Sequence, residues 1–222
     1  MPVTVHESLS REFLFYALAF LILLFALFKV FYTRYFNTIF RVFFNTSLRQ
    51  TQLTDILLQA RLPSLIFNIF FVLSTGIYVW FVQQFYRDNK SGNTISMISI
   101  CIGAVALIYI CKYFGLKLIG WLTGMQEAAD SYIFIIFLIN KIAGIVLIPF
   151  IILLGFAKQG WMEPLVYSSF FVVGILFLLR YLRSYSLLRH KITISRFHFL
   201  LYVAALEILP LIIIFRIARE SL

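Results

Sequence analysis

The chain has 222 residues, of which 62% are hydrophobic, and its mean hydropathy is +0.96. Soluble domains contain roughly 45–50% apolar residues, so this composition excludes a soluble globular protein and predicts a polytopic, all-α membrane protein. The formal charge of +10 does not indicate a nucleic-acid-binding protein, because the Lys and Arg residues are scattered between apolar runs. We expect these cations to face anionic lipid headgroups instead.

Six apolar runs are long enough to cross a membrane, because a spanning helix needs about 20 mostly apolar residues. The first run is too long for the core of a signal peptide and is expected to remain attached. Residues 115–124, after the third run, are interpreted as an interfacial continuation of that helix. The whole chain, 1–222, is therefore predicted to form one transmembrane domain. The runs cover residues 13–32, 63–86, 94–114, 132–156, 164–181 and 197–217.

The first loop, residues 33–62, contains the segment TRYFNTIFRVFFNTSLRQ, which has a helical period. One stripe is apolar and consists of Phe36, Ile39, Phe40, Phe43, Phe44 and Leu48. The opposite stripe is polar and consists of Arg34, Asn37, Thr38, Arg41, Asn45 and Arg49. This pattern predicts an amphipathic helix in the membrane interface, with Phe36, Phe40 and Phe43 in lipid and with Arg41 and Arg49 toward the headgroups. The helix serves either as an anchor for the loop or as a docking surface for a protein or lipid.

The positions of Lys and Arg predict the orientation, because cytoplasmic loops carry the excess of positive charge. With six spans, both termini are expected outside the cytoplasm. Twelve cations fall on the side of the first, third and fifth loops: Lys29, Arg34, Arg41, Arg49, Arg61, Lys112, Lys117, Arg180, Arg183, Arg189, Lys191 and Arg196. Six fall on the other side: Arg11, Arg87, Lys90, Lys158, Arg216 and Arg219.

Familiar catalytic and metal-binding spacings are missing from the sequence, which contains no HExxH, GxSxG or phosphate-binding GxxxxGK[ST] motif. No two of the three histidines share a helix at a spacing that suits a metal or haem. Cys101 and Cys111 fall within one predicted helix and are interpreted as small buried hydrophobes. We therefore expect a protein that is not an enzyme and that binds no cofactor or metal.

Two charged residues, Lys141 and Glu207, fall inside predicted membrane spans. Counted from the start of its own span, each is about 14–15 Å deep, near the middle of a ~30 Å hydrocarbon layer. A lone charge at that depth is costly, so the two are predicted to pair. Asn140 and Tyr202 are candidates to complete the polar cluster. Two interpretations remain: a structural salt bridge, or a functional site for a proton, an ion or a partner helix.

Two prolines, Pro149 and Pro210, follow these charges on the same helices. Proline removes a backbone donor and leaves a carbonyl without its usual partner, so both positions are predicted helix kinks.

The segments YIFIIFLINKIAGIVLIPF, residues 132–150, and FHFLLYVAALEILPLIII, residues 197–214, resemble a family of small polytopic inner-membrane proteins from Bacteroidota. The family is an uncharacterised domain of unknown function. The resemblance is most specific in the asparagine–lysine pair and in the acid-x-x-proline element. It implies a multi-pass protein of a bacterial cytoplasmic membrane, and it implies no activity.

Three classes of function are compatible with these features. The favoured expectation is a non-catalytic accessory subunit that anchors or stabilises a larger cell-envelope complex through its helices and its basic cytoplasmic face. Its expected partners are anionic membrane lipids and other membrane subunits or further copies of itself. The alternative is a small oligomeric transporter or channel that uses the Lys141/Glu207 site. An intramembrane enzyme ranks last, because Lys141, Glu207 and Tyr202 are the only candidate catalytic groups.

Overall fold

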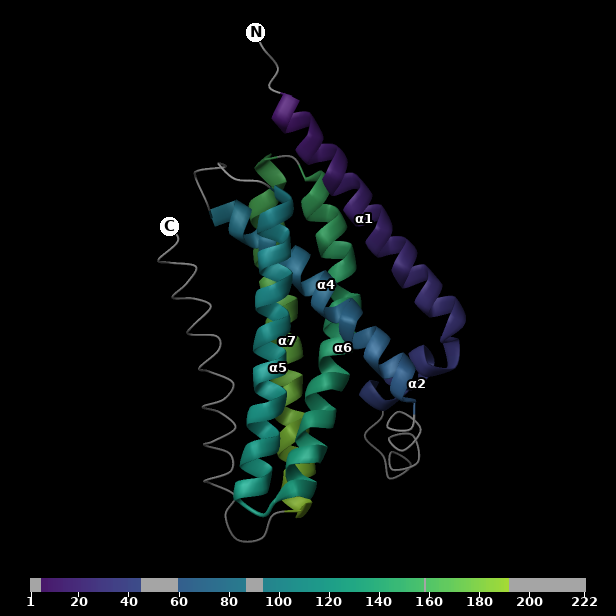
Figure 1. Ribbon diagram of the computed structural model, residues 1–222, viewed down its shortest axis with the longest axis vertical. Coiled ribbons are helices and arrows are strands. Elements are labelled where there is room, and N and C mark those ends of the chain that lie inside the picture. Colours follow the sequence, from purple (N-terminus) through teal and green to yellow (C-terminus); the bar gives the residue numbers. More distant parts are fainter. Residues whose placement is uncertain (1–4, 45–59, 87–93, 158, 192–222) are drawn as a thin grey trace.

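The structure is a computed structural model that describes residues 5–44, 60–86, 94–157 and 159–191. Every regular element in these ranges is an α-helix. Three long helices run side by side, α4 crosses them obliquely, and α1 lies on the outside with α2 at its lower end (Figure 1). The helices are α1 (Val5–Phe31), α2 (Thr33–Phe44), α4 (Arg61–Tyr86), α5 (Thr94–Leu122), α6 (Gln126–Phe156) and α7 (Gln159–Lys191).

Five of these helices are long and apolar enough to cross a membrane. Their apolar spans match the first five predicted runs closely, and α5 is a single helix through most of the segment predicted as its interfacial continuation. The sixth predicted run, residues 197–217, lies outside the described residues. The spans cover Leu14–Phe31, Leu62–Tyr86, Thr94–Leu122, Ala129–Phe156 and Gly160–Arg183.

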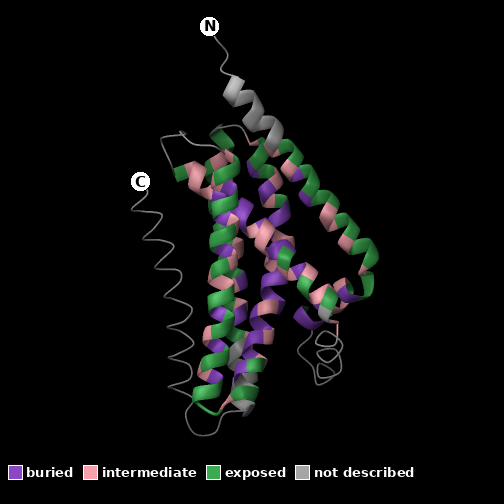
Figure 2. Ribbon diagram, viewed as in Figure 1, coloured by how far each residue is buried: buried purple, intermediate pink, exposed green. Residues whose placement is uncertain are grey.

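The core lies between α4 and α6. Half of the residues in the α4 span and 61% of those in the α6 span are buried, against 11% in the α1 span (Figure 2). Gly144 of α6 faces the backbone of α4, where an added Cβ would lie 2.8 Å from Cα of Phe71. Small residues allow such close contact between membrane helices, so Gly144 sets the spacing of the two central helices.

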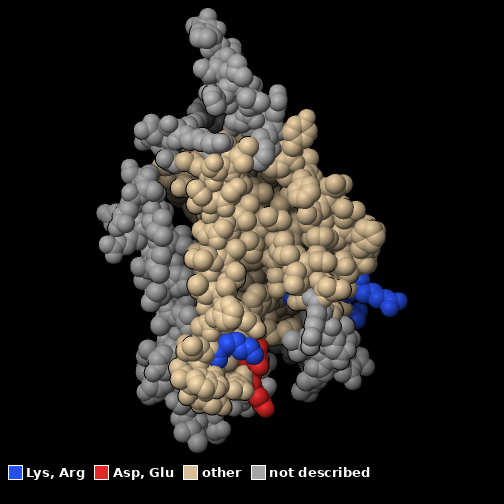
Figure 3. Space-filling view, viewed as in Figure 1, with Lys and Arg blue, Asp and Glu red and all other residues tan. Residues whose placement is uncertain are grey.

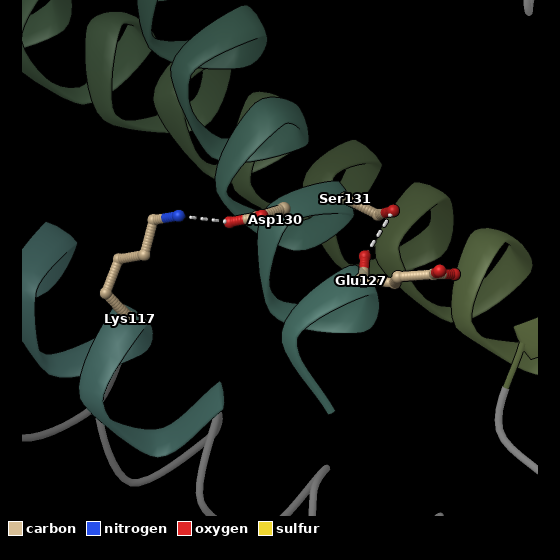
Figure 4. A network of polar contacts seen from close by, with 4 residues as sticks. All are labelled: Lys117, Glu127, Asp130 and Ser131. Carbon is tan, nitrogen blue, oxygen red and sulfur yellow. Dashed lines mark hydrogen bonds and ion pairs between the residues drawn. The ribbon is translucent and has the colours of Figure 1, made fainter. Parts of the chain in front are cut away.

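A tight turn joins α5 to α6. Gly124 has a φ of +69°, a left-handed conformation that favours glycine after a helix. Gly120 is buried, and a Cβ there would lie 2.5 Å from Cβ of Ala129. Lys117 and Asp130 form an ion pair of 2.8 Å across this hairpin (Figure 4). Both side chains are about half exposed, so the pair contributes little stability.

The predicted amphipathic helix is present as α2, and its burial pattern explains its sequence period. Ile39 and Phe43 are buried, whereas Arg34 and Arg41 are exposed. The apolar face of α2 packs against α4 and α6 and does not point entirely away from the bundle. Phe36 and Phe40 are half-buried, and Phe44 is exposed. Residues 45–59, which include Arg49 and Leu48, lie outside the described residues.

The interpretation of both cysteines as buried residues needs correction. Cys101 is buried as expected, but Cys111 is exposed. Ten helical residues correspond to 1,000° of rotation at about 100° per residue, which leaves the two side chains about 80° apart around the helix, so they have different surroundings. Trp80, within the second predicted run, is 5% exposed and packs in the central core.

Four described cations lie toward one end of the bundle. Lys29 lies in the last turn of α1, Arg34 and Arg41 lie on α2, and Arg183 lies in the second half of α7. The charged side chains seen on one face, acids included, lie over the lower part of the molecule (Figure 3). We define the region of Lys29, Arg34, Arg41 and Arg183 as the basic end.

Candidate functional site

Lys141 is the most unusual polar residue of the described core. It lies at the centre of α6 and is 6% exposed. Its Nζ donates hydrogen bonds to the hydroxyl oxygen of Tyr35 at 2.9 Å and to Oγ of Ser64 at 2.7 Å. Nζ also lies 5.5 Å from the centroid of the Tyr35 ring. A buried ammonium needs such compensation because leaving water is costly for a charge.

The partners of Lys141 come from the starts of two other helices. Tyr35 lies in the first turn of α2 and is buried, and Ser64 lies in the first turn of α4. Burial raises the pKa of Tyr35 above its ordinary value, and a hydrogen bond with Ser64 partly offsets this shift. The phenol therefore stays neutral at physiological pH. The three residues, which we call the lysine node, tie α2, α4 and α6 together.

The sequence singled out Lys141 but not these two partners. Asn140, expected to join it, is buried next to it in the sequence, but its Nδ2 has no hydrogen-bond partner within the described ranges. Consecutive helical residues point about 100° apart, which explains why Asn140 does not take part in the node. α6 continues through Pro149 without ending there. Tyr202, Glu207 and Pro210 lie outside the described residues, so the Lys141/Glu207 pair stays a prediction.

The contacts of Lys141 relate its position to two other spans. Tyr35 follows the end of the α1 span at Phe31, and Ser64 follows the start of the α4 span at Leu62. Lys141 thus lies beside the ends of two spans, although it is at the middle of its own helix, because α4 runs obliquely to α6 (Figure 1). Its expected depth in the membrane stays a prediction.

A serine hydroxyl bonded to a lysine amine is also an arrangement of nucleophile and base, which would need access to a substrate. An open pocket of about 420 Å³ lies nearby, between the end of α1, α2 and the start of α4. Tyr35 lines it, but Lys141 and Ser64 are not among its lining residues. The geometry therefore favours a structural role for the contact between Ser64 and Lys141. Among the described residues, no group of three His, Cys, Asp or Glu side chains could hold a metal ion.

Other buried polar contacts also join helices. The hydroxyls of Tyr78 on α4 and Ser169 on α7 lie 2.7 Å apart in the core. Arg183 of α7 donates from Nη1 to the backbone oxygen of Val42 at 2.8 Å, and its guanidinium lies 5.0 Å from the ring centroid of Phe43. Val42 and Phe43 lie near the end of the described α2, so Arg183 joins the second half of α7 to that end of α2.

We expect Arg183→Gln to lower the unfolding free energy by about 1–2 kcal/mol, because it removes a charge-assisted hydrogen bond and a cation–π contact. Arg41→Gln is the matched control, since Arg41 is exposed on α2 and the same charge is lost. Thermal unfolding of the purified protein in one detergent measures both. Equal shifts for the two variants would contradict a stabilising role for the contact between Arg183 and α2.

Comparison with known families gives one match. The model of the family described as a domain of unknown function (DUF4271) covers residues 14–218. No curated protein matches the chain. No solved structure matches it either.

Proposed function

The chain belongs to the DUF4271 family, whose description assigns no function, and we propose that it is a non-catalytic membrane subunit of a larger cell-envelope complex. The observation that carries the proposal is a small-residue face on α5, formed by Ser96, Ser99 and Gly103. These three residues are exposed and share one side of the helix by their spacing. No described residue lies within 4 Å of a Cβ built at Gly103.

Small residues allow the backbones of two membrane helices to approach closely. Elsewhere in this protein such contacts are filled: Gly144 meets α4, and Gly76 meets Ile102 of α5. The small-residue face of α5 is open in the described structure, and a helix of another subunit would fit it. α7 provides a contrast at the positions four and seven residues before its exposed Gly174, which carry the large exposed side chains of Phe170 and Tyr167. α5 has Ser99 and Ser96 at the same spacing from Gly103, although Ile100 and Leu107 beside that glycine are also large and exposed.

We propose that the membrane boundary on the basic side lies near the corner between α1 and α2, where the α1 span ends. From Leu14 to Phe31 this span rises about 25 Å at ~1.5 Å per residue. That length approaches the ~30 Å of hydrocarbon that a span must cross. The basic end then faces the cytoplasm, as the positive-inside rule expects, and the resemblance found in the sequence supports a bacterial cytoplasmic membrane.

Affinity purification of the full chain in a mild detergent, followed by mass spectrometry, tests the subunit role. We expect defined membrane partners to copurify with the unaltered protein, and Gly103→Leu to lose them because the side chain blocks close approach. Gly174→Leu is the matched control on α7 and should keep them. Recovery of the chain alone, or equal loss with both variants, would contradict the proposal.

A transporter is the second candidate, and the lysine node is the observation that favours it. Buried ionisable residues inside membrane spans often mark proton or ion pathways. Lys141 is such a residue, and Tyr35 connects it to an open pocket. In this role the protein would purify as an oligomer of itself, so the same purification separates the two candidates.

A further inference from the structure

The pocket at the corner of α1 and α2 has two kinds of wall. Its volume is about 420 Å³, and it opens to the outside of the bundle. Its lining residues include an apolar group, Val30, Phe31 and Pro63, which we call the apolar wall, and a polar group with Arg34 and Tyr35, which we call the polar wall. A ligand that fills this pocket therefore needs an apolar part beside a polar part.

The polar wall is positively charged. Arg34 is exposed on α2, and the buried ammonium of Lys141 lies 2.9 Å behind the hydroxyl of Tyr35. Lys29, also exposed, lies in the last turn of α1. No acidic residue is among the described lining residues. These cations would attract a negatively charged group of the ligand.

The described acids lie near the starts of α6 and α7, and none of them lines the pocket beside its cations. Asp130 and Glu127 lie near the start of α6, where Asp130 binds Lys117. Glu163 lies near the start of α7, at the other end of the bundle (Figure 1). Within the described ranges, no carboxylate is paired with Lys141 or Arg34.

The polar residues that line the pocket differ in their capacity to donate hydrogen bonds to an anion. The hydroxyls of Thr33 and Thr38 donate to carbonyls of their own helical segments, at Lys29 and Arg34 respectively, so their protons are used. A guanidinium offers five N–H groups in a planar fork that matches phosphate oxygens. Arg34 is thus the residue that would bind an anion directly. Lys141 lies behind Tyr35, so its charge would attract the anion without contacting it.

We infer that this pocket binds the phosphate headgroup of an anionic phospholipid, held by Arg34, with its acyl chain against Val30, Phe31 and Pro63. The place of the pocket supports a lipid, because the α1 span ends at Phe31 and the headgroup layer begins where a span ends. Free inorganic phosphate shares the headgroup chemistry but would not use the apolar wall. The inference is independent of whether the protein is a subunit or a transporter.

Thermal unfolding of the detergent-purified full chain, with added lipid, tests the site. We expect phosphatidylglycerol to stabilise the unaltered protein more than phosphatidylcholine does, and Arg34→Gln to weaken that binding about tenfold by removing a charged hydrogen bond. Arg41→Gln is the matched control, because Arg41 is exposed on the same helix and does not line the pocket. Native mass spectrometry of the unaltered protein, which needs no variant, should show a retained anionic lipid.

Three outcomes would overturn the inference. Equal stabilisation by the two lipids would mean that the pocket has no preference for an anion. Equal weakening by Arg34→Gln and Arg41→Gln would indicate diffuse attraction to the membrane surface. Stabilisation by inorganic phosphate to the same extent, at matched ionic strength, would assign the pocket to a small ion and not to a lipid. Arg34→Lys keeps the charge without the fork, so weaker but measurable binding would support the direct role of the guanidinium.

Discussion

Gly144→Val is expected to lower the unfolding free energy by about 3 kcal/mol or more, the upper range for overpacking a tight core. A Cβ at this position would lie 2.8 Å from Cα of Phe71 and 3.1 Å from Oγ of Ser74. The nearer atom belongs to the α4 backbone and cannot turn aside as a flexible side chain would. The two central helices would have to separate, which weakens every contact along their interface. Thermal unfolding in a single detergent measures the loss.

Gly103→Val is the matched control for this prediction. It makes the same change in a helix that is long and apolar enough to cross a membrane, but no atom of the described part of the chain lies within 4 Å of its Cβ. Valine has a somewhat better helix propensity than glycine, so we expect a change within about 0.5 kcal/mol. If both variants lose the same stability, the cost comes from the helix itself and not from the contact between α4 and α6.

The spans could be predicted from the sequence because each one follows from local composition. A run of about 20 apolar residues is sufficient evidence for a membrane-spanning helix, and the first five runs correspond to α1, α4, α5, α6 and α7. The amphipathic period of residues 33–44 likewise predicted α2, since burial alternates along a helix with a fixed period. Neither signal depends on which helices are neighbours.

The partners of Lys141 could not be predicted in the same way. Tyr35 and Ser64 are 106 and 77 residues away in the sequence, and each lies in the first turn of a helix. A single tyrosine or serine near a helix start has many uses, so it gives no local signal. Only the oblique path of α4 and the turn after α1 bring them to the centre of α6. The cost of a buried charge identified Lys141, but the packing of the helices determined its neighbours.

The buried ammonium of Lys141 calls for a negative charge nearby that would balance it. An ammonium has three N–H groups, and Tyr35 and Ser64 accept two of them. Both acceptors are neutral, so a buried charge with one remaining donor would be stabilised by a carboxylate. Glu207, which lies in the sixth predicted run, is the acid that the sequence proposes.

We therefore expect Lys141→Met and Glu207→Gln to destabilise the protein by about 3–5 kcal/mol each, because each change leaves an uncompensated charge or partner in a buried site. The double variant should regain much of that loss, and a double-mutant cycle on detergent unfolding measures the coupling. Tyr35→Phe is a useful comparison, since it removes one neutral acceptor and should cost about 1.5–3 kcal/mol. Simply additive losses for Lys141 and Glu207 would show that the two residues are not paired. In that case the hydroxyls of the lysine node, together with another acid of the chain or a bound anion, would stabilise the ammonium.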